Sequence, residues 1–417
     1  MSAEQVLAPG ALEEPFVPVR RRYIGSVALV NLGITIAFFT PIQSLLPRLA
    51  QEVAPDSKET ALAWITGAGA FASIFFNPLA GALSDRTTVR WGRRKPWVLG
   101  GALAGAAGIV LLGVPGTVLG LALVWFVCQA TINGSYAAIT ATIPDQVPVR
   151  QRGLVSGWVG IATTVGVVVG VALVSFVVTD LRPGLVLTAA LLVLLVLPFV
   201  LGVRDVALPR EQQPAFHLGA WLRGFWISPR EYPDFAWAWI TRFLMMLGNS
   251  MATLYLLFWL QDAVEYPEPE QGQTVLIALY ALGTILTAVV FGRISDRSGR
   301  RKVYVIVATI VMAVAAVILA FFPVFPAAML AALVLGLGYG MYLAVDQALV
   351  TQVLPRAIDR GRDLGVINIA NSAPQVLAPV IAAPIVTGVA GYTGLYLITA
   401  VITLLSAVLV TRIRSVP

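Results

Sequence analysis

Two stretches of sequence decide the fold: GALSDRTTVRWGRRKP at residues 81–96 and GRISDRSGRRK at residues 292–302. Each follows a long apolar stretch, and each carries a Gly, an Asp-Arg pair and a second Gly followed by basic residues, in the same order. A weaker repeat relates DQVPVRQRGLVSG at 145–157 to TQVLPRAIDRGRDLG at 351–365. Self-similarity of this kind indicates two related halves in parallel orientation.

The composition is that of a membrane protein. Hydrophobic residues make up 58% of the chain, charged residues make up 12%, and the mean hydropathy is +0.85, whereas roughly a quarter of the residues in a soluble domain are charged. A membrane-spanning helix needs about 20 mostly apolar residues. The sequence therefore predicts an all-α membrane protein with twelve transmembrane helices in two six-helix bundles. The predicted spans are 23–47, 60–84, 96–114, 117–143, 153–178, 183–203, 235–261, 272–294, 302–322, 326–353, 363–388 and 391–411.

Hydropathy and repeat position predict the domain organisation. The expected parts are a cytoplasmic N-terminal tail (1–22), an N-terminal six-helix bundle (23–203), a central cytoplasmic loop (204–234), a C-terminal six-helix bundle (235–411) and a cytoplasmic tail (412–417). The first residues are polar and acidic and lack the apolar segment of a signal peptide, so we expect a tail there.

Basic residues predict the orientation in the membrane. Of the 28 Lys and Arg residues, Arg48, Lys58 and Arg182 fall on one side, Arg242 lies within a span, and all others fall on the opposite side. Because basic loops are retained in the cytoplasm, we expect a multi-pass protein of the cell membrane with both termini cytoplasmic. The net charge of +7 then reflects topology and attraction to membrane lipids, not nucleic-acid binding.

The repeated loop resembles the signature loop of the major facilitator superfamily, and the resemblance covers the entire chain. Its first copy comprises Gly81, Asp85, Arg86, Gly92, Arg93 and Arg94, and its second Gly292, Asp296, Arg297, Gly299, Arg300 and Arg301. The longer first copy is similar to that of the sucrose-transporter-like and glycoside/cation symporter branch. The resemblance implies a secondary active transporter that works by alternating access, with proton-coupled import of a sugar or glycoside as the leading function. We expect a monomer without cofactor or metal that takes a small-molecule substrate and protons.

The loop residues form a candidate conformational latch. A carboxylate at a cytoplasmic helix end can pair with guanidinium groups and with the positive end of a neighbouring helix, and such contacts can form and break as two bundles rock. Alternatively, the arginines only anchor the helices on the positive side of the membrane, the interpretation favoured for Arg94 and Arg301. Gly81 and Gly292 allow close helix contact. The predicted latch residues are Gly81, Asp85, Arg86, Arg93, Gly292, Asp296, Arg297 and Arg300.

Two charged residues are predicted inside the membrane, Arg242 and Asp346. An ionisable side chain is costly there unless it faces water, a partner or a substrate. Counting at 1.5 Å per residue places both roughly 11 Å from the cytoplasmic face, so we expect a pair. One interpretation is that Asp346 carries the proton and Arg242 sets its pKa or meets the substrate. The other is a permanent structural ion pair.

Polar residues at helical spacing predict the substrate cavity. Gln129, Asn133 and Tyr136 share one face of a span, and comparable stripes occur on four others. Each Asn or Gln could instead make only an interhelical hydrogen bond. The resemblance places the neutral Gln129 where sucrose/proton symporters carry an aspartate. The candidate cavity residues are Asn31, Gln129, Asn133, Tyr136, Asn249, Tyr339, Tyr342, Asn368, Asn371 and Gln375.

Other functions leave weaker traces in the sequence. A proton-coupled antiporter exporting a drug or other small organic molecule is the main alternative, although the fifth span lacks the Gly-Pro pair of the drug/proton antiporter branch. A membrane enzyme would need convergent nucleophiles or metal ligands, whereas the chain has a single histidine, His217. Asp359 and Asp363 are interleaved with arginines, which favours a salt-bridged loop. We therefore expect no enzyme. A passive channel would not accumulate substrate.

Overall fold

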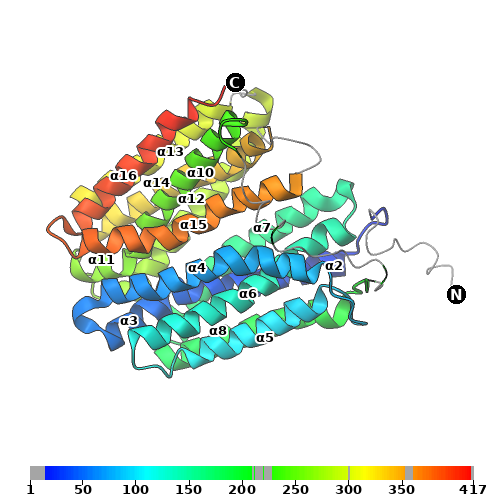
Figure 1. Cartoon of the computed structure of the whole chain (residues 1–417). Helices are drawn as coiled ribbons and strands as arrows, with labels where there is room; N and C mark the ends of the chain where they lie inside the picture. The colour runs from blue at the N-terminus through cyan, green and yellow to red at the C-terminus, as the bar shows by residue number, and fades with distance from the viewer. Residues whose placement is uncertain are drawn as a thin grey trace. The chain divides into compact units, whose positions relative to one another are not determined.

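The protein is helical in every part that the structure describes. The computed structural model describes the backbone of residues 15–208, 211, 219, 228–298, 301–352 and 360–414, and within these ranges every regular element is a helix (Figure 1). The helices form two compact units, one comprising residues 1–49 and 71–215 and the other residues 50–70 and 216–417.

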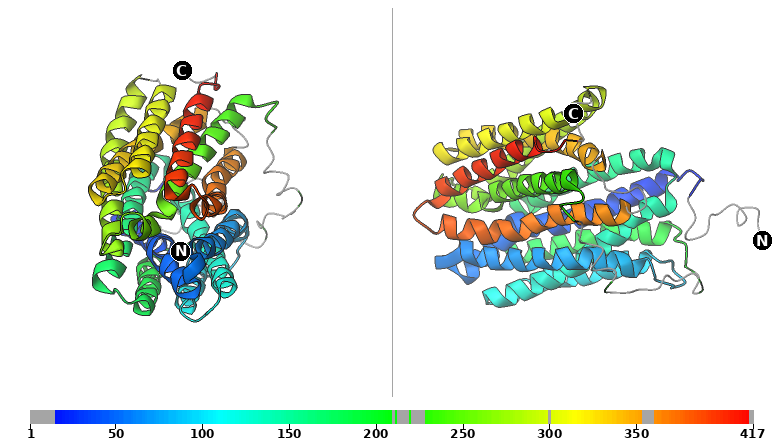
Figure 2. Two further views of the ribbon diagram at one scale, coloured as in Figure 1. Left: turned by 90° about the vertical axis from the view of Figure 1, so that its left-hand side faces the viewer. Right: turned by 45° about the horizontal axis from the view of Figure 1, so that its top comes forward.

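The first unit is built on a long helix that continues through a proline. α2 (Arg21–Thr40) passes through a π-helical turn at Pro41–Leu45 into α3 (Leu46–Val53). The wider turn accommodates Pro41, which has no N–H to donate, and the helix continues to Val53, beyond the predicted end at 47. α2 packs on α7 and α8, and α5 packs on α6 and α8 (Figure 2). The other helices are α4 (Lys58–Ser84), α5 (Lys95–Leu111), α6 (Val118–Gln146), α7 (Val149–Ala172), which ends in a π-helical turn at Leu173–Val177, and α8 (Leu181–Gly202).

The second unit repeats the helix pairs of the first and adds a close pair between α12 and α14. α14 packs between α12 and α13, while α10 packs on α15 and α16. A break at Tyr255, whose φ and ψ are −101° and 15°, separates α10 from α11. The helices are α10 (Pro233–Leu254), α11 (Leu256–Asp262), α12 (Pro269–Ser298), α13 (Arg301–Phe321), α14 (Phe325–Gln352), α15 (Arg360–Val386) and α16 (Gly391–Val410).

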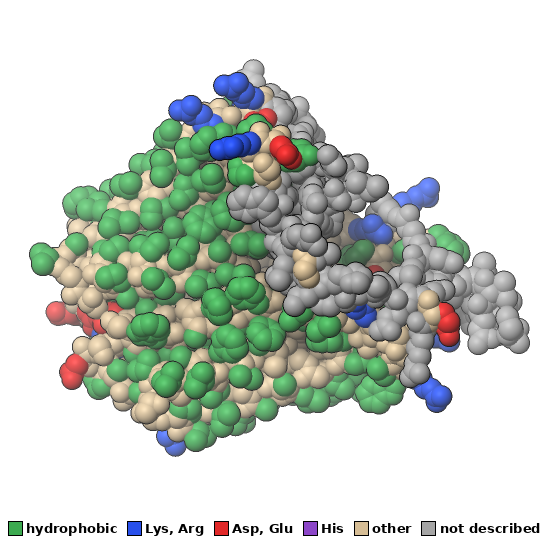
Figure 3. Space-filling view, in the orientation of Figure 1, with side chains coloured by type: hydrophobic (Ala, Val, Ile, Leu, Met, Phe, Trp, Pro, Cys, Tyr) green, Lys and Arg blue, Asp and Glu red, His purple; other side chains and the backbone are tan. Residues whose placement is uncertain are grey.

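The helices match the predicted membrane spans. Among the described residues, 11 helical segments are long and apolar enough to cross a bilayer, and the shorter α5 is also apolar. Large apolar side chains such as Leu201, Leu119 and Val401 are exposed, and hydrophobic side chains are spread over much of the described part of the face drawn in Figure 3. Such a surface is stable in lipid. The prediction of an all-α membrane protein with twelve transmembrane helices is confirmed.

Glycines bring α12 and α14 into backbone contact. A Cβ added at Gly336 would lie 2.1 Å from the carbonyl oxygen of Tyr280, and one at Gly340 would lie 2.2 Å from that of Thr284. Since backbone atoms cannot turn away as a flexible side chain can, glycine is required at these two positions. The contact aligns Tyr280 with the middle of α14.

We expect Gly336→Ala to destabilise the protein by about 3 kcal/mol, because its methyl group would overpack a backbone contact. Thermal unfolding in detergent measures the loss. Gly100→Ala is the matched control, since a Cβ on this helical glycine would meet no atom within 4 Å. Equal unfolding temperatures for the two variants would contradict the close packing of α12 and α14.

Candidate functional site

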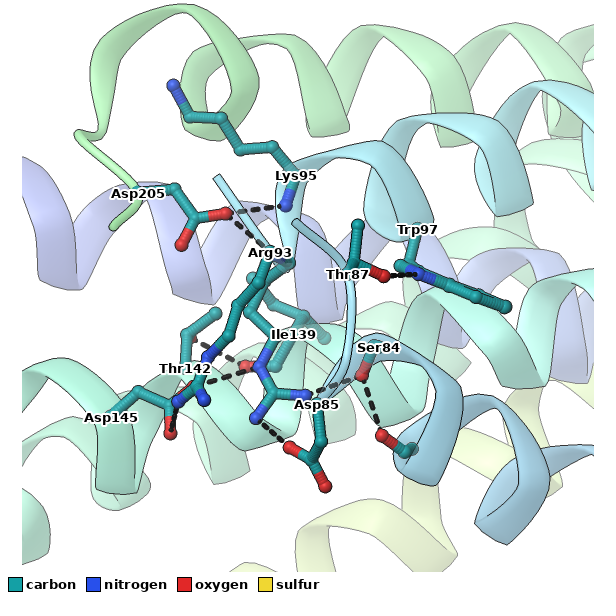
Figure 4. Close-up of polar contacts among 12 residues, drawn as sticks. Ser84, Asp85, Thr87, Arg93, Lys95, Trp97, Ile139, Thr142, Asp145 and Asp205 are labelled. Carbon is teal, nitrogen blue, oxygen red and sulfur yellow. Dashed lines mark hydrogen bonds and ion pairs between the residues drawn. The ribbon is translucent and has the colours of Figure 1, made fainter. Parts of the chain in front are cut away.

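Arg93 and Arg94 form the centre of a buried polar cluster in the first unit (Figure 4). Arg93 Nη2 lies 2.6 Å from Asp145 Oδ1, and Arg94 Nε lies 2.8 Å from Asp145 Oδ2. Arg94 also pairs with Asp85 and donates a hydrogen bond to Ser84 Oγ. Its exposed fraction is 3%. We refer to Ser84, Asp85, Arg93, Arg94 and Asp145 as the loop cluster; it joins the ends of α4 and α6 to the start of α5.

Asp205, just after α8, caps the start of α5 from a distant part of the chain. The backbone N–H groups of Arg94 and Lys95 donate to Asp205 Oδ2 over 2.7 and 2.9 Å. These donors have no partner within their own helix, and a carboxylate also suits the positive end of the helix dipole. Burial raises the pKa of Asp205, while the two N–H groups and Arg94 act in the opposite direction.

Gly92 makes the approach of Asp205 possible. Its φ is +109°, and a Cβ at this position would lie 2.3 Å from the Asp205 carboxyl group. A side chain at residue 92 would therefore be strained in its backbone and would collide with the cap. The loop is held further by Trp97 Nε1, which donates to Thr87 Oγ1 over 2.7 Å.

The structure changes the assignment of two predicted loop residues. Arg94, interpreted from the sequence as an outer anchor, is instead the most highly connected member of the loop cluster, because the turn after Gly92 directs it inward. A Cβ at Gly81 would lie 4.0 Å from Ala137 Cβ, which is an ordinary van der Waals distance. The helix packing described here therefore does not require a glycine at residue 81. Arg86 is half-buried in the turn after α4.

The second copy of the loop cannot be compared with the first. The surroundings of Gly292, the side chains of Asp296 and Arg297, and the whole of Arg300 lie outside the described residues. Their role as a latch stays a prediction.

Arg242 and Asp346 form an ion pair in the second unit. Arg242 Nη1 on α10 lies 2.8 Å from Asp346 Oδ2 on α14. Arg242 Nε also donates to Asn371 Oδ1 on α15 over 2.7 Å. The exposed fractions of Arg242 and Asp346 are 7% and 5%. Three helices therefore converge on one buried pair of charges, in which the guanidinium group has both a charged and a neutral acceptor.

Tyrosine rings extend from this ion pair along α14. Tyr342 is one turn before Asp346, and its ring lies 6.4 Å from that of Tyr339. Tyr339 stacks on Tyr280 of α12 with ring centroids 5.7 Å apart. The Tyr280 hydroxyl donates to Asn249 Oδ1 over 3.1 Å. Tyr280 was not predicted, although Thr284 and Thr287 lie one and two helical turns after it. The glycines at 336 and 340 mark the contact of its helix with α14.

A smaller polar group occurs in the first unit. Asn133 Nδ2 donates to Gln129 Oε1 over 3.0 Å, and Asn77 Nδ2 on α4 donates to Asn133 Oδ1 over 3.2 Å. Asn77 is a further residue that the sequence did not single out. Asn31 is buried and donates to the Val27 carbonyl within its own helix. Tyr136 packs edge-on against Phe38.

The predicted cavity residues thus fall into different settings. Asn371, Tyr342 and Tyr339 surround or adjoin the Arg242–Asp346 pair, and Asn249 joins them through Tyr280. Gln375 is exposed. The side chain of Asn368 lies outside the described part of α15.

Comparison with known proteins identifies a transporter family. The family model described as "Major Facilitator Superfamily" matches residues 26–273 and 238–417. Sucrose transport protein SUC4 of Arabidopsis thaliana is 30% identical over 112 residues, which are 27% of this chain and 20% of that protein. The match thus spans one fifth of the relative.

Solved transporter structures share the fold. The nucleoside transporter NupG is 15% identical, with a TM-score of 0.73 over 94% of this chain and 99% of that one. The POT family transporter PepTSo is 11% identical, with a TM-score of 0.75 over 95% of this chain and 98% of that one. At these identities the likeness concerns the fold alone.

We expect Arg94→Gln to lower the free energy of unfolding by about 2 kcal/mol, because it removes a buried guanidinium group that bonds Asp85, Asp145 and Ser84, while Asp145 retains only Arg93 as a cation. Arg90→Gln is the matched control: Arg90 is exposed in the same loop, so its loss should change stability by less than about 0.5 kcal/mol. Thermal unfolding of both variants in detergent makes the comparison. Similar losses of unfolding free energy in the two variants would indicate that Arg94 only anchors the loop on the positive side of the membrane.

Proposed function

The chain belongs to the Major Facilitator Superfamily, and on that premise we propose that it is a proton-coupled importer of a sugar or glycoside that works by alternating access. The observation that carries the proposal is the buried Arg242–Asp346 pair. Membership of a transporter family supports transport as the general activity. The pair adds a carboxylate, Asp346, that can exchange a proton.

Asp346 is the proton carrier in this proposal. In its ionised form it neutralises Arg242, so the two charges stabilise each other in a setting of low dielectric. Protonation of the carboxylate would leave Arg242 with only the neutral Asn371 oxygen as a close partner. The uncompensated guanidinium group could then bind substrate oxygens. Substrate and proton would in this way be bound together, as symport requires.

A polyhydroxylated substrate suits the neighbouring side chains. Asn249 and Asn371 offer amide groups, and the stacked rings of Tyr280 and Tyr339 offer flat apolar faces. Aromatic faces pack on the C–H surfaces of sugars while amides bond their hydroxyl groups. The local similarity to a sucrose transport protein supports the same class of substrate.

The remaining assignments belong to the same proposal. The loop cluster acts as a conformational latch at the cytoplasmic face, and the second copy of the loop, at 292–302, acts likewise. The protein is a monomer of the cell membrane with both termini in the cytoplasm, and its bundles comprise residues 23–203 and 235–411. The cavity includes Asn31, Gln129, Asn133 and Tyr136 from the first bundle, together with the predicted residues of the second.

We expect Asp346→Asn to abolish substrate accumulation driven by a pH gradient while preserving exchange of substrate across the membrane, because the amide cannot carry a proton. Uptake of radiolabelled sucrose and other glycosides into proteoliposomes, with and without an imposed pH gradient, measures both activities. Asp180→Asn, which neutralises an exposed carboxylate at the start of α8, is the matched control and should retain accumulation.

The double variant Arg242→Gln, Asp346→Asn tests whether the ion pair couples the proton to transport or only stabilises the fold. The double variant should recover the stability that either single change loses, but it should still lack proton-driven accumulation. If it regains accumulation as well, the pair is structural and Asp346 does not couple the proton. Proton-driven efflux of a drug panel by the unaltered protein, without sugar uptake, would favour the antiporter instead.

We expect a reporter fused after Pro417 to lie in the cytoplasm, on the same side as the loop at 85–95. The excess of basic residues on that side is the physical reason. A fluorescent protein that folds only in the cytoplasm and an alkaline phosphatase that is active only outside it give opposite signals. A reporter inserted after Glu265, which is exposed between α11 and α12, should give the reverse pattern. An external signal at Pro417 would overturn the orientation.

A further inference from the structure

Three segments of the first unit meet at the end of α8. The start of α2 packs there, since a Cβ added at Gly202 would lie 2.7 Å from Arg22 Nη2. The loop before α5 packs three residues further along, where a Cβ added at Gly92 would lie 2.3 Å from the Asp205 carboxyl group. Residues around 22, 92 and 204 are therefore close together although they are far apart in the sequence.

Basic side chains and one tryptophan surround this meeting point. We name Arg22, Arg90, Trp91, Lys95 and Arg204 the basic patch. The three arginines are exposed and Lys95 is half-buried. The Lys95 side chain points away from the loop cluster, while its backbone N–H donates to Asp205 (Figure 4). The basic patch is thus an outer surface of the unit, separate from the buried loop cluster beneath it.

The charges of the basic patch are not neutralised by the protein. Within the ranges that the structure describes, none of its four basic side chains forms an ion pair, whereas the adjacent Arg93 and Arg94 pair with carboxylates. Asp205 is the carboxylate in contact with these segments, and its Oδ2 already accepts from two backbone N–H groups. Four cations beside one occupied carboxylate leave a surface that attracts an anion.

Apolar side chains lie among these charges. The exposed fraction of Trp91 is 64%, and those of its neighbour Val89 and of Val206, which follows the cap residue Asp205, are 48% and 41%. An indole ring is most stable where one side meets hydrocarbon and the other meets polar groups, as at the surface of a bilayer. A soluble anion needs no such apolar surroundings. Basic and apolar groups together therefore fit a ligand that has an anionic head and an apolar tail.

We propose that the basic patch binds the headgroup of one anionic phospholipid. The guanidinium groups of Arg22, Arg90 and Arg204 donate charge-assisted hydrogen bonds to its phosphate oxygens, and the Trp91 ring packs at the level where the acyl chains begin. Basic pockets between membrane helices are suited to such headgroups. The lipid site lies outside the proposed substrate and proton site, and its existence does not depend on which substrate is transported.

Lipid binding to the full chain in detergent tests the proposal. Native mass spectrometry with phosphatidylglycerol should show one retained lipid, and phosphatidylcholine with the same acyl chains should bind more weakly. The triple variant Arg22→Gln, Arg90→Gln, Arg204→Gln should lower the affinity for phosphatidylglycerol by roughly tenfold or more, because it removes the charge-assisted donors. Trp91→Ala should lower it by about threefold, because it removes the apolar face.

The matched control is the triple variant Arg230→Gln, Arg412→Gln, Arg414→Gln, which removes three exposed arginines from the second unit on the side predicted to be cytoplasmic. It should bind phosphatidylglycerol as the unaltered chain does. Phosphatidylglycerol should raise the unfolding temperature of the unaltered chain and of this control, but not that of the patch variant. Unfolding temperatures without lipid show whether each variant is folded.

Three results would overturn the proposal. Equal losses of phosphatidylglycerol binding in the two triple variants would show a general attraction between positive charge and anionic lipid. Equal affinities of the unaltered chain for the two lipids would show that the headgroup charge is not recognised. Displacement of the lipid by millimolar inorganic phosphate would show a site for a soluble anion.

Discussion

Hydrocarbon offers no hydrogen bonds, and this constraint shapes the whole chain. Every backbone N–H and C=O group within a membrane must be bonded inside the protein, so each span is a helix. Charged side chains must remain at the helix ends or be paired. The chain obeys this rule at the loop cluster and at the Lys58–Asp262 pair, which lie at helix ends. The one described exception at depth is Arg242 with Asp346, and there three helices supply the partners.

The sequence predicted those features that depend on composition and spacing. Apolar stretches of sufficient length determine the spans, and equal distances from the cytoplasmic helix ends placed Arg242 near Asp346 before any contact was known. Such arguments succeed because a helix has a fixed rise and a membrane has a fixed thickness. The first helix continues beyond the predicted end at 47, because α3 includes polar residues such as Arg48, Gln51 and Glu52 that hydropathy does not assign to a span.

Contacts between distant segments could not be predicted in the same way. Asp205 lies 111 residues from the amide that it caps, and no periodic pattern relates the two. Arg94 looks like one of many basic loop residues until Gly92, with its positive φ, turns the chain so that the guanidinium group enters the loop cluster. Tyr280 likewise depends on the glycines of α14. Each missed residue has its role through a partner that only the folded chain brings near.

The two ends of α4 differ in how easily water can replace their contacts. At the loop cluster, Arg94 is buried and its cation serves two carboxylates and a hydroxyl. At the start of α4, the ion pair between Lys58 and Asp262 is partly exposed, and such pairs contribute only about 0–1 kcal/mol. A conformational equilibrium responds to differences of a few kcal/mol. The loop cluster therefore contributes more to the position of α4 than the ion pair at the start of this helix.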